Sequence, residues 1–335
     1  MKLFDHDSSA FLKVEYVIGG ISTYVYNTEA LQPYIEAQNK STKNVDDIPI
    51  NVLYLIHQRE GDYRFTESIA YVILKQYYEK KQRGSDDASG NLSDIPLICV
   101  TFDLRNHGLR LIDKSKNLDW KQGNETHALD MISGIMGNVA DLKLIMDFLP
   151  SYLNLEKLLT PEFRQQNQHW KFQFRNILSG YSLGAHTVFR FVNEHPEHIW
   201  GINPVVGCID LSSLLINRMK GNKLDSPDYD KKWFYYTYEE LQLTEEEREK
   251  YPEHLHNYLS AEDTQIFENF PMNNVKIFAS FGAEDKLVPM KLSSIWCDSY
   301  LNTNDSTEIF VQEGKKHEVT DEMVDGFTTW LVKNL

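Results

Sequence analysis

The feature that most constrains the fold is a serine between two glycines, in the segment Gly180-Tyr181-Ser182-Leu183-Gly184. The apolar pair Ile177-Leu178 precedes this segment, and residues 185–194 after it have the pattern of a helix. A strand, a sharp turn and a helix in this order put the serine on a strained turn, where flanking glycines let neighbouring backbone approach without a Cβ clash. The sequence therefore predicts a serine presented at the end of a buried strand.

Two further polar segments follow apolar runs nearer the carboxyl end of the chain. The first, Gly282-Ala283-Glu284-Asp285-Lys286-Leu287-Val288-Pro289, comes directly after residues 275–281, and the second, Gly314-Lys315-Lys316-His317, closes the run 308–311. Short apolar runs of this kind are typical of buried parallel strands. Because open parallel sheets bind their ligands at the carboxyl ends of the strands, we expect the serine, the aspartate and the histidine to meet there.

The chain order serine, aspartate, histidine, with the serine in a G-x-S-x-G turn, resembles the α/β-hydrolase superfamily, and its dienelactone-hydrolase and prolyl-oligopeptidase-like esterase branches look similar. The resemblance extends from about Asn51 to the end of the chain. It implies an α/β-hydrolase fold, with a mostly parallel central sheet flanked by helices. It also implies a catalytic triad in which Ser182 attacks a carbonyl carbon, His317 transfers the serine proton and Asp285 orients the imidazole.

The resemblance further implies two backbone N–H groups that would stabilise the oxyanion. One belongs to Leu183, and the other comes from the loop His57-Gln58-Arg59-Glu60-Gly61 after the first buried strand. Relatives usually have a glycine after the histidine, whereas this chain has Gln58, and the match to their motif assigns the donor to Arg59. The Arg59 side chain could meet a substrate carboxylate, although a solvated or paired arginine is the more common state of a loop residue.

Three other polar positions have structural interpretations. Some relatives take the triad acid from the end of the preceding strand, where Asp210 stands, but Asp285 has the full G-x-x-D-x-x-V-P context and Asp210 fits the N-cap of a helix. The segment Asp103-Leu104-Arg105-Asn106-His107-Gly108 resembles a turn that many α/β-hydrolases carry, and we assign it to structure rather than catalysis. His186 is expected to be packed or hydrogen-bonded rather than to act as a base.

The remaining pattern alternates strands and helices, as a parallel sheet with flanking helices requires. Residues 11–27 predict an antiparallel hairpin at the sheet edge, residues 38–48 a polar loop, and residues 83–94 a mobile surface connection. The further predicted elements are strands over 52–56, 97–102 and 202–206, a helix over 67–81, a helix around 135–149 that Pro150 ends, and a last helix that Thr320 caps, with an apolar face of Met323, Phe327, Trp330 and Leu331.

The alternation breaks between residues 209 and 270, where no further buried strand is predicted. We interpret this segment as a cap or lid inserted into a single α/β-hydrolase domain formed by residues 1–335. It contains an aromatic run over residues 233–238 and an acidic run over residues 245–249. The aromatic run either lines an acyl or alcohol pocket or packs the cap onto the core, since aromatic side chains dominate core burial generally.

The chain is acidic, with 34 Lys and Arg against 49 Asp and Glu and a formal net charge of −15. This excess argues against binding to nucleic acid or to an anionic membrane surface, both of which need a basic face. Highly anionic substrates are disfavoured as well, unless a local basic patch overrules the total charge. The sequence has no phosphate loop, no dinucleotide fingerprint and no convincing set of metal ligands, so we expect no cofactor and no metal.

The three cysteines and the chain start bear on the cellular compartment. Cys99 and Cys208 lie within apolar runs, which predicts buried free thiols and a reducing compartment. The first residues lack the apolar core of a signal peptide, and no stretch is long enough to span a membrane. We therefore expect a cytoplasmic protein.

The resemblance implies that this protein cleaves a small carboxylic ester through an acyl-serine intermediate. Two alternatives stay open at this point. One is a thioesterase, lactonase or prolyl-oligopeptidase-type peptidase that uses the same site. The other is a non-catalytic binding protein that retains the fold, because fold alone does not fix function.

Overall fold

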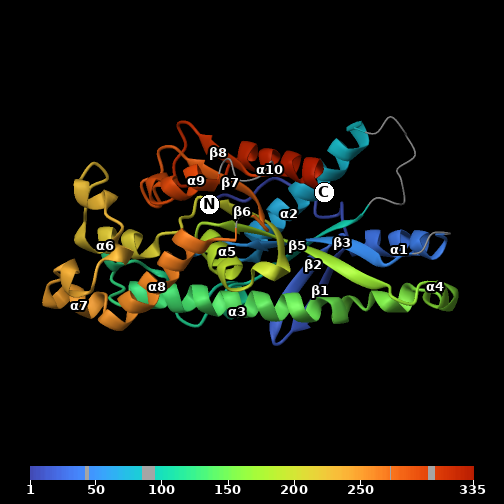
Figure 1. The fold of residues 1–335 in the computed structure, drawn as a ribbon, viewed down its shortest axis with the longest axis horizontal. Coiled ribbons are helices and arrows are strands. Elements are labelled where there is room, and N and C mark those ends of the chain that lie inside the picture. The colour runs from blue at the N-terminus through green and yellow to red at the C-terminus, as the bar shows by residue number, and fades with distance from the viewer. Residues whose placement is uncertain (42–44, 85–94, 272, 301–305) are drawn as a thin grey trace.

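A central sheet of eight strands runs through the computed structural model, which describes residues 1–41, 45–84, 95–271, 273–300 and 306–335 (Figure 1). The order of the strands across the sheet is β1-β2-β4-β3-β5-β6-β7-β8. β1 and β2 form an antiparallel hairpin that joins β4 antiparallel, and all later neighbours are parallel. The strands are β1 (Lys13–Ile18), β2 (Ile21–Tyr26), β3 (Asp47–Ile56), β4 (Leu97–Phe102), β5 (Lys171–Tyr181), β6 (Ile199–Val205), β7 (Lys276–Gly282) and β8 (Glu308–Gln312).

Helices cover both faces of this sheet (Figure 1). α2 (Tyr63–Gly84) and α10 (Asp321–Asn334) pack together on one face, and α3 (His127–Leu153) and α5 (Leu183–Glu194) pack together on the other, with α8 (Glu253–Asn269) against α5. The other helices of the described residues are α1 (Leu31–Asn39), α4 (Pro161–Gln166), α6 (Leu211–Lys220), α7 (Glu245–Lys250) and α9 (Ser294–Tyr300). The predicted parallel sheet with flanking helices is therefore confirmed.

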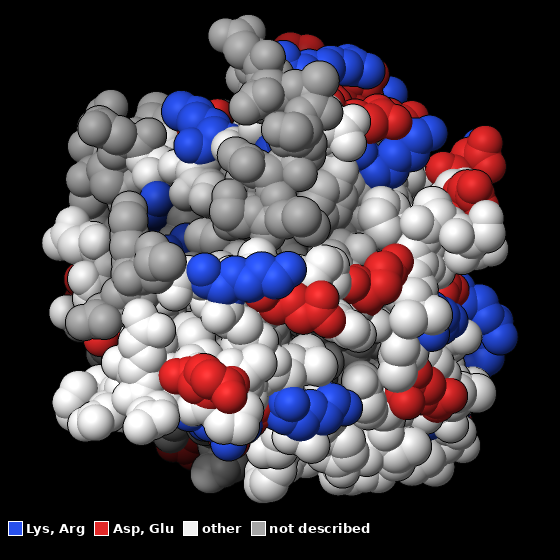
Figure 2. Space-filling view, turned by 90° about the vertical axis from the view of Figure 1, so that its right-hand side faces the viewer, with Lys and Arg blue, Asp and Glu red and all other residues white. Residues whose placement is uncertain are grey.

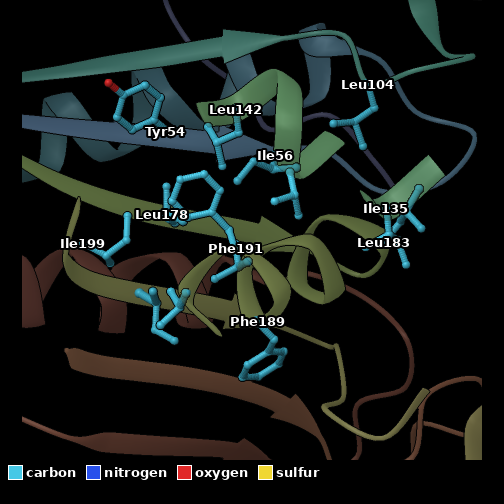
Figure 3. Close-up of a cluster of buried hydrophobic side chains, with 14 of the residues drawn as sticks. Tyr54, Ile56, Leu104, Ile135, Leu142, Leu178, Leu183, Phe189, Phe191 and Ile199 are labelled. Carbon is cyan, nitrogen blue, oxygen red and sulfur yellow. The ribbon is translucent and has the colours of Figure 1, made fainter. Parts of the chain in front are cut away.

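Alternate residues of the buried strands point to opposite faces of the sheet, which produces two apolar cores. On β3, Tyr54 and Ile56 belong to the core on the α3 and α5 side, whereas Leu53 and Leu55 belong to the core on the α2 and α10 side. Figure 3 shows the first core, in which side chains of the strands meet side chains of the two helices: Tyr54, Ile56, Leu178, Ile135, Leu142 and Phe191. The sheet is thus anchored from both sides.

The carboxyl ends of the parallel strands lie in register. Ile56 at the end of β3 pairs with Gly180 on β5, and Gly282 at the end of β7 pairs with Gln312 at the end of β8. Loops that are far apart in the sequence therefore begin side by side at one edge of the sheet. At the opposite edge, beside α1 and α4, basic and acidic side chains are intermixed on the surface (Figure 2).

Most predicted elements form close to their expected bounds, and two differ. The hairpin, the strands and the last helix with its Thr320 cap are confirmed. The predicted loop over 38–48 overlaps the end of α1, a helix that the polar pattern did not predict, and the start of β3. α1 forms because Leu31, Tyr34 and Ile35 give it a short buried face. The predicted connection over 83–94 lies mostly outside the described residues.

The helix α3 does not end at Pro150, as predicted, but continues to Leu153. A proline in a helix removes one N–H donor and crowds the preceding turn. Near the carboxyl end this loss is limited, because few later residues depend on the disturbed turn. Asn154 then ends the helix in a left-handed conformation, with φ 46° and ψ 48°, and donates its N–H to the Pro150 carbonyl at 3.0 Å.

The segment between β6 and β7 contains α6, α7 and α8, and no strand in its described part. A buried ion pair between Arg190 on α5 and Asp263 on α8 ties the segment to the core. The Asp263 carboxylate also accepts the backbone N–H groups of Leu211, at 3.4 Å, and Ser212, at 2.7 Å, at the start of α6. One buried carboxylate therefore joins three helices.

The aromatic run of this segment packs mainly inward. Trp233, Phe234 and Tyr238 are buried, whereas Tyr235 is exposed. Trp233 donates its indole N–H to the side-chain oxygen of Asn217 on α6 at 3.2 Å. Of the two interpretations of this run, packing within the protein fits the buried positions.

Two general features of the chain complete the fold. Cys99, Cys208 and Cys297 are all buried and unpaired, as the sequence predicted for the first two. Within the described residues, no helix has both the length and the apolar character needed to cross a membrane.

Replacing Asp263 with alanine should lower the free energy of unfolding by about 3–5 kcal/mol, because the change leaves the Arg190 guanidinium buried without a carboxylate. Urea unfolding followed by circular dichroism measures this loss. The control is Asp147→Ala, which breaks the more exposed Lys143–Asp147 pair, whose atoms are 2.6 Å apart, and should cost less than about 1 kcal/mol. Equal losses in the two variants would contradict the anchoring role of Asp263.

Candidate active site

Ser182 lies on a strained turn between β5 and α5. Its backbone angles are φ 54° and ψ −108°, a region that residues other than glycine rarely adopt. The Ser182 N–H donates to the Val205 carbonyl at 2.9 Å, and its own carbonyl accepts from Ala185 at 2.9 Å and His186 at 3.2 Å. These hydrogen bonds hold the serine in a conformation that would otherwise cost about 1–3 kcal/mol.

The two glycines around Ser182 are required by close backbone contacts. A Cβ atom on Gly180 would lie 2.2 Å from the Gly184 carbonyl oxygen, and one on Gly184 would lie 2.0 Å from the Ile56 carbonyl oxygen. Both distances are far below any van der Waals contact. The turn can therefore bring β3, β5 and α5 together only if both positions lack a side chain.

The loops after β7 and β8 pack against each other in the same way. The Glu284 N–H donates to the Lys315 carbonyl at 2.8 Å. A Cβ atom on Gly282 would lie 2.2 Å from the Lys316 carbonyl oxygen, so this position also has to be glycine. The backbone of one loop thus fixes the other, which places the residues that follow, Asp285 and His317, side by side.

Ser182, His317 and Asp285 form a continuous chain of hydrogen bonds. Ser182 Oγ lies 2.8 Å from His317 Nε2, and His317 Nδ1 lies 2.7 Å from Asp285 Oδ2. The other carboxylate oxygen, Oδ1, accepts the backbone N–H groups of Leu287 at 2.8 Å and Val288 at 2.9 Å. A carboxylate only accepts hydrogen bonds, so Nδ1 carries the imidazole proton and Nε2 accepts from the serine hydroxyl.

Asp210, the alternative acid, occupies a different position. Its side chain accepts the Ser213 N–H at 2.8 Å and caps the start of α6, as its structural interpretation predicted. Burial, followed by the charge of Asp263, raises the pKa of this carboxyl, and the Lys232 ammonium at 3.6 Å opposes the rise. Within the described residues, Asp210 has no hydrogen bond to His317.

The two backbone N–H groups predicted for the oxyanion have no acceptor among the described residues. Leu183 is the first residue of α5, where helix geometry leaves the N–H without an intrahelical acceptor. The Arg59 N–H also has no acceptor among the described residues. Both residues line one cavity of about 750 Å³.

Gln58, at the position where the resemblance implied a glycine, turns its side chain against Gly61. A Cβ atom on Gly61 would lie 2.7 Å from Gln58 Nε2. The Gly61 N–H donates to the Gln58 carbonyl at 3.1 Å and closes the turn. Gly61 thus provides the space that the larger side chain at position 58 needs, a compensation that a motif comparison at position 58 does not reveal.

His57 joins the loops that follow β3 and β4. Its Nδ1–H donates to the Gln58 carbonyl at 2.8 Å, and its Nε2 accepts the Leu104 N–H at 3.0 Å. Both ring nitrogens are therefore engaged in positioning backbone. Burial lowers the pKa of His57 to about 3, so the imidazole is neutral at physiological pH.

The turn over residues 103–108 is held by its own hydrogen bonds, as its assignment to structure predicted. The Asp103 carboxylate accepts the N–H groups of Tyr63 and Leu109, both at 2.8 Å. Arg105 forms a bidentate pair with Asp141, at 3.0 and 2.8 Å. The turn shapes one wall of the cavity without contacting Ser182 in the described residues.

His186 is an interior histidine, as expected. Its Nδ1 lies 3.0 Å from the Cys208 carbonyl oxygen, and its side chain is buried. Burial lowers the pKa of this imidazole to about 3. Within the described part of the chain, no group of three or more His, Cys, Asp or Glu side chains could hold a metal ion.

The cavity beside Leu183 and Arg59 has an apolar wall from the segment after β4. Leu109, Leu111 and Ile112 line it and are exposed, Ile112 to 92%. Exposed apolar side chains that gather at one cavity are one feature that binding surfaces share. The aromatic run over residues 233–238 does not line this cavity.

A methyl group at Gly184 should damage both folding and the site, because it would overlap the Ile56 carbonyl. We expect Gly184→Ala to lower the free energy of unfolding by at least about 2 kcal/mol, measured by urea unfolding. Gly134→Ala is a matched control, since Gly134 is also helical and a Cβ there meets nothing within 4 Å. That change should stabilise the protein by up to about 1 kcal/mol. A tolerated Gly184→Ala would disprove the required close contact.

Comparison of the sequence with models of protein families and with curated proteins finds no match. Among solved structures, TT1662 from Thermus thermophilus is similar, with 14% identity, a TM-score of 0.56 and coverage of 96% of each chain. The esterase Pf2001 from Pyrococcus furiosus has 13% identity and a TM-score of 0.48, with 99% of this chain and 98% of that chain covered. A putative dienelactone hydrolase from Klebsiella pneumoniae has 12% identity and a TM-score of 0.45, with coverage of 97% and 100%.

The comparison with TT1662 bears on the fold. The likeness to TT1662 spans nearly the whole of both chains. The strand order, with an antiparallel hairpin at one edge and parallel strands beyond it, agrees with the sheet that the sequence resemblance implied. The chain has the α/β-hydrolase fold.

Proposed function

We propose that the protein is a serine hydrolase that cleaves a small carboxylic ester through an acyl-serine intermediate. The observation that carries this proposal is the chain of hydrogen bonds from Ser182 through His317 to Asp285. A serine hydroxyl is a weak nucleophile on its own, and a neighbouring imidazole that accepts its proton activates it. A purely structural turn does not require a serine, a histidine and an aspartate that are hydrogen-bonded in this order.

The first half of the reaction transfers the acyl group to the enzyme. Ser182 Oγ attacks the ester carbonyl carbon while its proton passes to His317 Nε2, and Asp285 stabilises the imidazolium that forms. The carbonyl oxygen becomes negative and accepts hydrogen bonds from the N–H groups of Leu183 and Arg59. His317 then returns the proton to the departing alcohol oxygen, and the acyl-serine remains.

The second half of the reaction releases the acid. A water molecule gives a proton to His317 Nε2 and attacks the acyl carbon, which passes through a second oxyanion at the same two N–H groups. The proton returns to Ser182 Oγ as the carbon–oxygen bond breaks. The products are the carboxylic acid and the free serine, so the cycle consumes one water and one ester.

The cavity of about 750 Å³ beside Leu183 is the proposed substrate pocket. Its size suits a small ligand, and its apolar wall of Leu109, Leu111 and Ile112 suits a hydrocarbon part. The segment over residues 209–270 would act as the cap of the domain, because Arg218 on α6 reaches the loop that carries the triad acid.

Ser182→Ala should lower kcat/KM for a hydrolysed ester by at least about 10⁴-fold, because the change removes the nucleophile. Labelling with a fluorophosphonate should disappear in the same variant. The measurement uses a panel of esters, thioesters, lactones and prolyl amides, with thermal unfolding to verify the fold. Unchanged turnover by the folded variant would overturn the serine mechanism, and faster cleavage of another member of the panel would reassign the substrate class.

Asp285→Asn should cost about 10³–10⁴-fold in kcat, because an amide in this place favours the wrong imidazole tautomer. Asp210→Asn is the matched control: asparagine caps helices as well as aspartate does, so activity should stay within about threefold. Both variants are compared on the best ester of the panel. A larger loss in Asp210→Asn would move the acid to the end of β6.

A further inference from the structure

The Arg59 side chain lines the cavity, and its guanidinium has no acidic partner among the described residues. No carboxylate lies within ion-pair distance of it in the described residues, and its side-chain contact is His127 Nδ1, at 3.5 Å from Arg59 Nη1. That nitrogen also lies 3.0 Å from the Leu118 carbonyl oxygen, to which it can only donate. Because His127 Nδ1 carries a proton, it cannot accept from Arg59. The guanidinium donors of Arg59 therefore remain available to a ligand.

The wall of the cavity has an excess of positive charge. Its charged side chains are the cations Arg59, Arg105, Arg110 and Lys116 and the carboxylates Asp113 and Asp130. Behind the wall, Arg105 and Arg110 share the single carboxylate of Asp141, each at 2.8 Å. This local excess occurs in a chain whose formal net charge is −15.

Arg218 on α6 adds a second cation, which contacts the loop that follows β7. Its Nη2 donates to the carbonyl of Leu287, at 2.7 Å, two residues after Asp285. Its Nε is buried and has no hydrogen-bond partner, and no carboxylate is within ion-pair distance of its side chain in the part of the chain that the structure describes. Burial and then the charge of Arg59 lower the pKa of Arg218, so the two guanidinium groups repel each other.

The pKa of His127, which lines the cavity, responds to the same positive charges. Its side chain is buried, lines the cavity and leaves Nε2 without a partner. Burial, followed by the charges of Arg59 and Arg218, lowers the pKa of His127 to about 4. The imidazole is therefore neutral at physiological pH, and an anion would relieve the repulsion between the cations around it.

We propose that Arg59, supported by the charge of Arg218, binds a free carboxylate of the substrate, so that the preferred substrates are esters of acids with a second, ionised carboxyl group. This inference rests on the proposed esterase function. A planar guanidinium binds a carboxylate through two parallel hydrogen bonds, which fixes orientation as well as position. Arg59 would then act twice, with its backbone N–H on the oxyanion and its side chain on the free carboxylate.

The local charge can outweigh the total charge of the protein. At physiological salt, interactions between exposed charges are largely screened beyond about 8 Å. A carboxylate inside the cavity would therefore respond mainly to the charged side chains that line it, four of which are cations and two of which are carboxylates. From the sequence, we expect highly anionic substrates to be disfavoured unless a local basic patch overrules the total charge, and the cations that line the cavity beside Leu183 would form such a patch.

The test compares monomethyl glutarate with methyl pentanoate, two methyl esters of equal acyl chain length that differ in the terminal carboxylate. The release of acid gives kcat/KM for each. In the wild type, monomethyl glutarate should be the better substrate by about tenfold or more, and Arg59→Gln should lower this ratio by about tenfold or more. Arg59→Lys should recover part of the preference, and added salt should reduce it.

The matched control is Arg64→Gln, which removes the same charge from an exposed arginine, 3.4 Å from Asp62, that does not line the cavity. Its ratio should equal that of the wild type. Equal use of the two esters by the wild type, or an unchanged ratio in Arg59→Gln, would overturn the carboxylate site while leaving the esterase proposal intact.

A binding measurement separates this inference from the proposed function. If neither ester is hydrolysed, calorimetric titration of glutarate into the wild type and Arg59→Gln still tests the site. Glutarate should bind the wild type at least about tenfold more tightly. Equal binding, or no binding to either protein, would overturn the inference, and circular dichroism verifies that both proteins are folded.

Discussion

The site depends on one steric constraint, the contact between the backbone at Gly184 and the Ile56 carbonyl. This contact joins the start of α5 to the end of β3, so the turn with Ser182 and the loop with Arg59 share one rigid support. Both N–H groups proposed for the oxyanion lie on these two segments. A side chain at position 184 would separate them, and a shift of about 1 Å in such groups can cost 100-fold in rate.

The packing of the sheet stabilises the protein enough for this strained turn to persist. Ser182 adopts an unfavourable backbone conformation, and strain of this kind persists only where the surroundings determine it. Here, apolar cores cover both faces of the sheet, and hydrogen bonds to β6 and α5 hold the serine from either side. Asp285 and His317 reach it because β7 and β8 end in register, with a glycine where their loops cross.

Much of this arrangement was predictable from the sequence, because carboxyl ends of parallel strands must meet at one edge. The strand before Ser182, those before Asp285 and His317, and the cap at Thr320 follow from local pattern. The local pattern did not predict α1 or the end of α3, because a short buried face and a tolerated proline depend on tertiary packing. The fit of Gln58 against Gly61 also could not be predicted, because it depends on the three-dimensional arrangement of the loop. The cap interpretation of residues 209–270 stays a prediction.

The excess of positive charge at the cavity could not be predicted from the sequence, for a different reason. Arg59, Arg218 and His127 come from three distant segments. Only the fold shows which carboxylates are already engaged in ion pairs or hydrogen bonds with other groups. Asp263 pairs with Arg190, Asp141 with Arg105 and Arg110, and Asp285 accepts from His317 and two backbone N–H groups. Arg59 and Arg218 form no ion pair within the described residues, so a ligand carboxylate would relieve the repulsion between their charges. A substrate that supplies the missing charge would stabilise the folded protein and be recognised through the same contact.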